Sequence, residues 1–200
     1  KKKILENLKT LLIALVLAVI IRSIFIQPFY IPSSSMEKTL LVGDRLFVTK
    51  YTYGYSRHSL PFSLKIISDR IFYEEPSRGD VIVFKTPADN RTDYIKRMIG
   101  KSGDEIQFIS GDLYINKKKI FEEFLRKETV FCGSETLRVN IYKEKINKDS
   151  QYEIAYFEQG SSGDTDPYIV PKDHFFFLGD NRDCSKDSRF LMSVGYVKKE

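Results

Sequence analysis

The segment Ile31–Leu40 reads IPSSSMEKTL and divides the chain into two kinds of sequence. A long apolar run precedes it, and from Leu41 onward apolar and polar residues alternate in the pattern of β-strands. Pro28 and Pro32 predict an extended segment here, because proline disfavours helix at the residue before it and has no backbone N–H. On composition alone, three consecutive hydroxyls at such a position are more typical of a polar linker than of a catalytic site.

The composition is that of a folded protein whose basic groups lie mainly on its solvated surface. Its 200 residues are 42% hydrophobic and 14% aromatic, and the net charge is +5 at pH 7. These values exclude a disordered chain and suit one domain, or one domain that carries a subdomain. Basic and acidic residues are interleaved, and the one basic block is Lys1–Lys3. We therefore expect the lipid bilayer, and no nucleic acid, as a partner.

The two cysteines, Cys132 and Cys184, lack the spacing of a metal site, and we expect neither a metal nor another cofactor. They could form a disulfide in an oxidising compartment or remain free thiols, and their separation in the sequence does not decide between the two states. The chain has no initiator methionine. We therefore expect it to begin inside a longer or processed product.

The apolar run predicts a helix that crosses a membrane. Residues 11–21 read LLIALVLAVII, and Ile24–Ile26 extend the run past Arg22. A helix needs about 20 residues to cross the hydrocarbon core, which residues 4–26 supply. A cleavable signal peptide is the alternative, but no small-x-small cleavage site follows the run, which favours an uncleaved anchor. The lysines before the run predict a cytoplasmic amino terminus, with everything after Gln27 outside.

The remaining sequence predicts a mainly β fold. Strand-like segments separated by turn residues occur at 45–50, 81–84, 93–99, 112–120, 168–170 and 174–178. The segment 81–84 is continuously apolar, which is typical of a buried strand. Residues 51–76 look irregular, and residues 121–166 are more polar and less periodic, which predicts a looser β-subdomain.

The expected architecture is an antiparallel β catalytic core with an inserted smaller β-subdomain, preceded by one transmembrane helix. The predicted boundaries are 1–27 for the cytoplasmic end and anchor, 28–109 and 168–200 for the core, and 110–167 for the insertion.

A serine nucleophile needs a neighbouring base, and two kinds of base are available. A triad of Ser35, His174 and Asp180 is conceivable, although His174 precedes a very apolar strand, where a structural histidine is common. The alternative base is Lys96, whose neighbours on the same strand face are Tyr94 and Met98. An unperturbed lysine is almost wholly charged at pH 7, but burial among apolar groups favours the neutral amine that we expect here. Lys96 could instead be a lysine on an edge strand that prevents aggregation.

Five motifs in chain order resemble those of bacterial type I signal peptidases. They are Pro32–Met36 with Thr39–Leu40, Gly43–Asp44, 78–84 (RGDVIVF), 94–100 (YIKRMIG) with Gly103–Asp104, and 179–189 (GDNRDCSKDSR). The run that ends in IQPFYIP, residues 26–32, resembles the membrane segment of that family and its junction. Any one motif is weak evidence, whereas five in order after a membrane anchor are specific.

The resemblance implies a serine endopeptidase that removes signal peptides from exported pre-proteins after small-x-small sites, through an acyl-enzyme. By motif position, Ser35 is the nucleophile and Lys96 the general base. The Ser33 hydroxyl and the Ser35 backbone N–H form the oxyanion hole, and Ser185 orients Lys96. The implied substrate pockets are lined by Phe29, Ile31, Leu40, Tyr94 and Ile95. The implied supporting residues are Met36, Asp180, Arg97, Asp187 and Arg189.

Three positions depart from the family pattern. Lys38 stands where the family usually has a proline, and Cys184 stands where it usually has an asparagine just before the serine at position 185. Lys101–Ser102 stand where the family usually has an apolar residue followed by proline. The first two motivate one alternative, a catalytically inactive paralogue that acts as a membrane-anchored peptide-binding module. Another alternative is a self-cleaving Ser/Lys regulator attached to a DNA-binding module. The apolar anchor and the lack of a helix-turn-helix pattern argue against this regulator.

Overall fold

The structure, a computed structural model, describes residues 2–60, 69–160 and 163–199. The chain forms two compact units, one made of Lys1–Tyr30 and Arg45–Glu75, the other of Ile31–Asp44 and Pro76–Lys199. These bounds differ from the predicted domain boundaries, and the division into a catalytic core and an insertion stays a prediction. A mainly β fold of antiparallel sheets with an amino-terminal apolar helix is confirmed.

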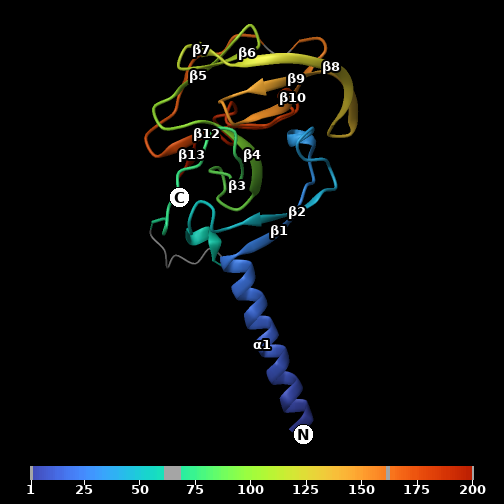
Figure 1. Cartoon of the computed structure of the whole chain (residues 1–200), viewed down its shortest axis with the longest axis vertical. Coiled ribbons are helices and arrows are strands. Elements are labelled where there is room, and N and C mark those ends of the chain that lie inside the picture. Colours follow the sequence, from blue (N-terminus) through green and yellow to red (C-terminus); the bar gives the residue numbers. More distant parts are fainter. Residues whose placement is uncertain (1, 61–68, 161–162, 200) are drawn as a thin grey trace. The chain divides into compact units, whose positions relative to one another are not determined.

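The first unit begins with the predicted apolar helix. Helix α1, Lys2–Ile24, has a mean hydropathy of 2.3 over its most apolar window and no buried residue, so by length and composition it can cross a membrane. The helix ends two residues before the predicted Ile26, because the chain enters strand β1, Ile26–Tyr30, around Pro28. Strand β1 pairs with β2, Arg45–Thr49, in a two-stranded antiparallel sheet (Figure 1).

Between residues 51 and 76, which the sequence predicts to be irregular, the described part contains one short 3-10 helix, η2, Arg57–Ser59. Residues 61–68 of this segment lie outside the described residues.

The second unit contains three antiparallel sheets. The first sheet, in the order β13-β12-β4-β3, comprises Val197–Lys198, His174–Leu178, Asp93–Gly100 and Val81–Lys85. The second, in the order β11-β5-β6-β7, comprises Tyr168–Ile169, Glu105–Ile109, Asp112–Ile115 and Lys118–Lys119. The third, in the order β10-β9-β8, comprises Gln151–Phe157, Glu135–Lys145 and Phe121–Cys132. The strand β3, expected to be buried, is only partly buried.

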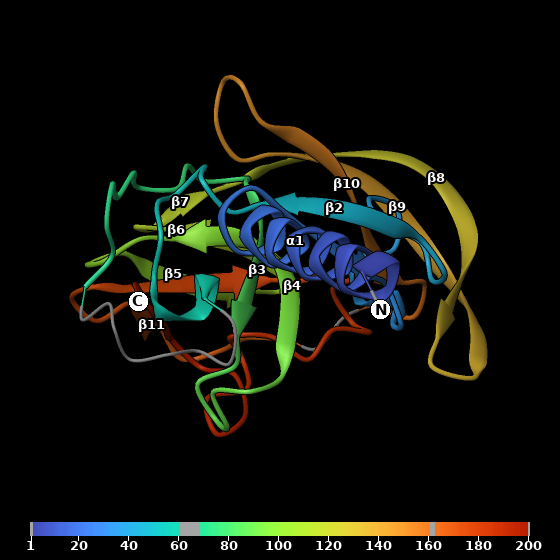
Figure 2. The same ribbon diagram turned by 90° about the horizontal axis from the view of Figure 1, so that it is seen from below.

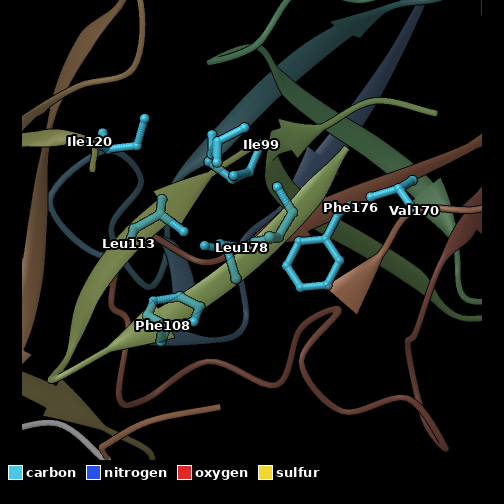
Figure 3. Packing of buried hydrophobic residues seen from close by; sticks show 9 residues of the cluster. Ile99, Phe108, Leu113, Ile120, Val170, Phe176 and Leu178 are labelled. Carbon is cyan, nitrogen blue, oxygen red and sulfur yellow. The ribbon is translucent and has the colours of Figure 1, made fainter. Parts of the chain in front are cut away.

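The largest hydrophobic cluster of this unit lies between its first two sheets. Ile99 and Phe176 come from neighbouring strands of the first sheet, and Phe108 and Leu113 from a hairpin of the second (Figure 3). Each such side chain contributes about 1.5–3 kcal/mol when it leaves water. This burial fixes β4, the strand that carries Lys96, against the second sheet.

The expectation of an extended nucleophile segment is wrong in part. Ser33 is extended, but Ser34–Met36 form a short 3-10 turn, η1, and Lys38 has a φ of 88°. Proline restricts only its own φ and the residue before it, so Pro32 leaves the residues after Ser33 free to turn. The fully buried Met36 holds the turn in place.

The described part of residues 121–166 is mainly β structure, as expected, but its strands are longer and more regular than the weak periodicity of the sequence suggests. This region holds the long strands β8 and β9, which run side by side with β10 (Figures 1 and 2). The pattern is hard to recognise because charged residues interrupt the apolar alternation of β8 and β9, among them Glu123, which lies opposite Lys143.

Candidate active site

The structure brings Ser35 and Lys96 into direct contact. Strand β4 carries Lys96, and the turn η1, anchored by Met36, carries Ser35. The Lys96 Nζ donates a hydrogen bond to Ser35 Oγ. Both residues are buried, with Lys96 3% and Ser35 7% exposed. An amine and a hydroxyl in this arrangement can exchange a proton, which is what activation of a serine nucleophile requires.

The surroundings of Lys96 lower the pKa of its amine to about 8. Burial is the main cause, since removal from water disfavours the ammonium, while the carboxylates of Asp187 and Asp180 partly oppose it. The amine also lies 5.4 Å from the centre of the Tyr94 ring. With a pKa of about 8, roughly one amine in ten is neutral at pH 7, against about one in 2,500 for an ordinary lysine.

The other serines implied by the resemblance lie around this pair. The Ser33 hydroxyl is 3.4 Å from Ser35 Oγ. The Ser185 side chain is buried, and its hydroxyl has no hydrogen-bond partner among the described residues. The structure therefore shows no hydrogen bond from Ser185 to Lys96, and the orienting role of Ser185 stays a prediction.

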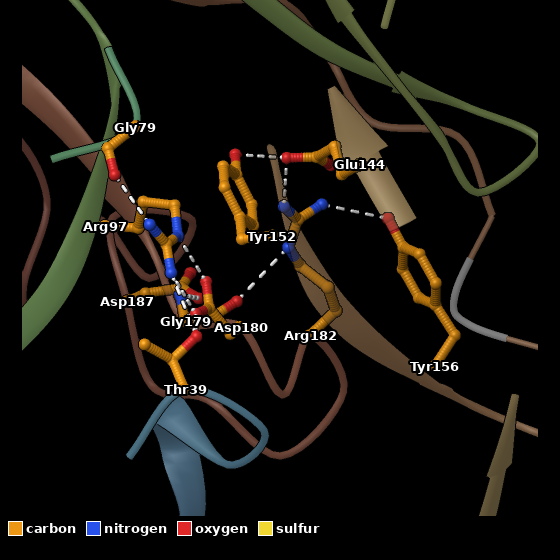
Figure 4. A network of polar contacts seen from close by, with 10 residues as sticks. All are labelled: Thr39, Gly79, Arg97, Glu144, Tyr152, Tyr156, Gly179, Asp180, Arg182 and Asp187. Atoms are coloured by element: carbon orange, nitrogen blue, oxygen red, sulfur yellow. Dashed lines mark hydrogen bonds and ion pairs between the residues drawn. The ribbon is translucent and has the colours of Figure 1, made fainter. Parts of the chain in front are cut away.

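Two charged pairs, both expected from the sequence, support the site. The guanidinium of Arg97 donates two hydrogen bonds to the Asp180 carboxylate, at 2.8 and 2.5 Å (Figure 4). Arg189 donates to the Asp187 carboxylate from Nε at 2.8 Å, and Asp187 also accepts from the backbone N–H of Gly179 at 3.0 Å. These contacts fix the loop that follows β12.

Sequence reasoning missed a second, fully buried network next to this loop. Arg182 donates to the Glu144 carboxylate at 2.7 Å, to the Tyr156 hydroxyl at 3.1 Å and to the Gly179 carbonyl at 3.2 Å (Figure 4). The hydroxyl of Tyr152 also donates to Glu144. A paired buried arginine holds its partners in one geometry, so the network fixes the loop from the side of the third sheet. Arg182 and Gly179 lie in a motif, whereas Glu144, Tyr152 and Tyr156 carry no local signal in the sequence.

Two further residues join the segments that carry Ser35 and Ser185. Thr39 donates to Asp180 and accepts from Arg97 at 3.0 Å. Asn181 donates from its backbone N–H to the Ser35 carbonyl and from its side chain to the Ser34 carbonyl, both at 3.2 Å. Both Thr39 and Asn181 lie in the motifs, which indicates that they matter but does not identify their partners.

The expected pocket residues are distributed over both units. Ile31 is buried, while Leu40, Tyr94 and Ile95 are partly exposed, and all four belong to the second unit. Phe29 lies on β1 in the first unit. Their role in binding substrate stays a prediction.

His174 and Asp180, the other two members of the alternative triad, have other hydrogen-bond partners. A ring nitrogen of His174 lies 2.7 Å from the Lys172 carbonyl, and Asp180 is occupied by Arg97 and Thr39. Among residues 2–60, 69–160 and 163–199, no group of three or more His, Cys, Asp or Glu side chains could hold a metal ion.

The cysteine question, left open by the sequence, is decided by the fold. Cys132 and Cys184 form a disulfide that joins the end of β8 to the residue before Ser185. The Cys184 sulfur also lies 3.7 Å from the Ser34 hydroxyl.

Comparisons with known proteins point to one family. Residues 4–200 match the family model described as signal peptidase, peptidase S26. Signal peptidase I of Rickettsia bellii (strain OSU 85-389) is 37% identical over 204 residues, which cover 98% of this chain and 69% of the relative. Signal peptidase I of Rickettsia akari (strain Hartford) is 40% identical over 195 residues, which cover 92% and 71%. A crystal structure of a signal peptidase I from Enterococcus faecalis is 26% identical, with a TM-score of 0.35 over 63% of this chain and 92% of that chain.

Proposed function

Because the chain belongs to the signal peptidase family, peptidase S26, we propose that it removes signal peptides from exported pre-proteins through a Ser35/Lys96 dyad. The observation that carries the proposal is the hydrogen bond between the buried Lys96 amine and Ser35 Oγ. The family assignment supports a peptidase and does not favour the inactive, peptide-binding alternative.

The proposed reaction begins when the neutral Lys96 amine takes the proton of the Ser35 hydroxyl. Ser35 Oγ then attacks the scissile carbonyl carbon, and the Ser33 hydroxyl and the Ser35 backbone N–H stabilise the oxyanion that develops. The Lys96 ammonium returns the proton to the leaving amine as the peptide bond breaks. A water molecule, deprotonated by Lys96, next attacks the acyl carbon. The ester bond to Ser35 Oγ then breaks, the Lys96 ammonium returns the proton to Oγ, and the signal peptide leaves with a free carboxylate.

The proposed substrate is the small-x-small end of a signal peptide. Ile31, Leu40, Tyr94, Ile95 and Phe29 would line its pockets. Helix α1 would anchor the chain with its amino terminus in the cytoplasm and the catalytic unit on the outer side, because Lys2, Lys3 and Lys9 all lie in its first half. A substrate whose own apolar segment lies in the same bilayer would then meet the enzyme in two dimensions.

A cleavage assay in detergent tests this function. A pre-protein with a small-x-small site is incubated with the full chain and with the variants Ser35→Ala, Lys96→Ala and His174→Ala, and the products are identified by mass. We expect a cut directly after the small-x-small site that the first two variants lose and the third retains. Loss of cleavage in Ser35→Ala and His174→Ala, with cleavage kept in Lys96→Ala, would indicate a triad. Absence of cleavage by the parent chain would favour the peptide-binding alternative.

A further inference from the structure

The end of strand β8 contacts both segments that carry the proposed catalytic groups. The ion pair of Lys38 with Glu128 links it to the segment that carries Ser35. The disulfide from Cys132 to Cys184 links it to the loop that carries Ser185. Between these two links, the side chain of Asn181 lies 3.4 Å from the Phe131 carbonyl. The two departures from the family pattern that raise the question of activity, Lys38 and Cys184, thus both contact the same strand.

Lys38 combines an unusual backbone conformation with a side chain that is held by an ion pair. Its φ of 88° lies in the left-handed region, which residues other than glycine rarely adopt. Proline, whose φ is fixed at about −65°, cannot adopt this conformation. The lysine side chain is 17% exposed and pairs with Glu128, which also accepts from Arg126. Arg126 in turn donates two hydrogen bonds, at 3.0 and 2.7 Å, to Glu153 on β10. Lys38 is therefore attached to a sheet by a chain of charged groups.

The disulfide attaches the segment that carries Ser185 to β8, as the ion pair of Lys38 attaches the segment that carries Ser35. Cys184 directly precedes Ser185, whose side chain packs closely against Gly179. An atom placed at the Cβ position of Gly179 would lie 2.1 Å from Ser185 Oγ and 2.4 Å from the Ser35 carbonyl oxygen. The Ser185 side chain, Gly179 and the Ser35 backbone are thus in direct contact, so a shift of Cys184 would be transmitted to the nucleophile segment.

We propose that Glu128–Cys132, here called the β8 brace, positions the active site, with Lys38 and Cys184 as the positioning residues that attach the two catalytic segments to it. This inference rests on the proposed Ser35/Lys96 function. The brace contacts the segments that carry Ser35 and Ser185 through Lys38 and Cys184. It acts by holding Ser35 and Ser185 at the positions that Lys96 requires, and therefore affects turnover more than substrate affinity.

Reduction of the disulfide tests one link in the intact protein. Dithiothreitol transfers two electrons and two protons to the sulfurs, the S–S bond breaks, and two cysteine thiols and the cyclic oxidised reagent result. We expect kcat on a signal-peptide substrate to fall by roughly tenfold or more, with KM changed by less than about twofold, because a small misplacement of reacting groups is costly. The Cys132→Ala/Cys184→Ala double variant is the matched control and should have the low kcat with and without the reagent.

A double-mutant cycle tests the other link and does not depend on the disulfide. Lys38→Met and Glu128→Gln should each lower kcat by roughly tenfold, and the double variant should lose no more than either alone, because the two residues act as a pair. Lys38→Arg keeps the charge and should retain most of kcat. The control on the same strand is Lys127→Ala, which breaks an exposed 2.5 Å ion pair with Glu158 and should leave kcat unchanged.

Each outcome decides between the proposals. Unchanged kcat after reduction, verified by thiol titration, together with unchanged kcat in the Lys38 and Glu128 variants, would overturn the brace. Equal losses in the Lys127 control, or additive losses in the cycle, would also overturn it. Retention of cleavage by Ser35→Ala or Lys96→Ala would overturn the proposed function instead. Thermal unfolding of every variant ensures that folded proteins are compared.

Discussion

At the scale of single residues, the surroundings of Lys96 determine how readily its amine becomes neutral. The side chain is 3% exposed, and its amine contacts the Ser35 hydroxyl. Burial lowers the pKa of the amine, whereas Asp187 and Asp180 raise it, and burial is the stronger influence. The balance makes the neutral amine accessible near neutral pH while the ammonium remains available to protonate a leaving group.

The pKa of Lys96 predicts how activity depends on pH. The value of about 8 means that the neutral amine is scarce at pH 6 and predominates above pH 8. We expect kcat/KM to rise with pH and to reach half its maximum at about pH 8, as measured by initial rates of cleavage. His174→Ala should show the same midpoint. A midpoint near the ordinary lysine value of about 10.4 would contradict the proposed base.

Gly179 predicts a steric effect at the same scale. A methyl group there would overlap the Ser185 side chain, 2.1 Å from its Oγ, and the Ser35 carbonyl oxygen at 2.4 Å. Because backbone and a buried loop must move to accommodate it, Gly179→Ala should lower kcat by roughly a hundredfold. Gly163→Ala is the matched control, since no atom of another described residue, its chain neighbours apart, lies within 4 Å of its Cβ position. Equal activity of the two variants would refute the close contact.

At the scale of elements, strand β8 has a second property besides the proposed brace. Glu122 lies directly opposite Glu144 on β9, and one oxygen of each carboxylate is buried without a hydrogen bond among the described residues. Burial, and after it the charge of Glu144, raises the pKa of Glu122 to about 7. Like charges directly opposite each other destabilise a strand pair, so Glu122 favours its neutral form in the folded protein.

This raised pKa predicts the direction of a stability change with pH. Between about pH 4.5 and 7 the unfolded chain loses the Glu122 proton while the folded protein retains it, so stability falls as pH rises through this window. Glu122→Gln stays neutral and should stabilise the protein at pH 8 by about 1–3 kcal/mol, with a smaller effect at pH 5. Denaturant unfolding in detergent measures both values. Glu123→Gln, on the exposed face of β8, should show no such pH dependence.

At the scale of the whole molecule, one chain combines an apolar helix with a catalytic unit. Helix α1 has no buried residue, so among the described residues its apolar surface is exposed. The hydrocarbon core of a bilayer is the environment that such a surface favours. The proposed substrates carry apolar segments into the same bilayer.

Two arginines in the middle of α1 should therefore detach the protein from the membrane. Each charge near the centre of a membrane helix costs about 2.5–3.5 kcal/mol on insertion scales. Leu15→Arg/Val19→Arg should move the protein from the carbonate-resistant membrane pellet to the soluble fraction, whereas Leu15→Phe/Val19→Ile should stay in the pellet. The arginine variant should process a membrane-inserted pre-protein poorly and still cleave a soluble peptide. Its retention in the pellet would refute the anchor.

The sequence by itself determined the class of fold, the strands β2, β3, β4, β6, β7, β11 and β12, and the residues proposed for catalysis. Alternation predicted β2, because side chains on a strand point to opposite faces, apolar runs predicted β3 and β12, and the long apolar run identified α1. Motif order singled out Ser35 and Lys96, which lie 61 residues apart in the chain. These features are local, or depend on short motifs, and can therefore be recognised without coordinates.

The tertiary structure alone decided which distant groups meet. The lowered pKa of Lys96 depends on burial, which neighbouring residues in the sequence do not determine. The pairing of Cys132 with Cys184, the pairing of Arg182 with Glu144 and the left-handed Lys38 depend on β8 and β9 packing beside the catalytic loops. Such contacts join segments far apart in the chain, and side-chain chemistry specifies them only once the backbone has brought the partners within bonding distance.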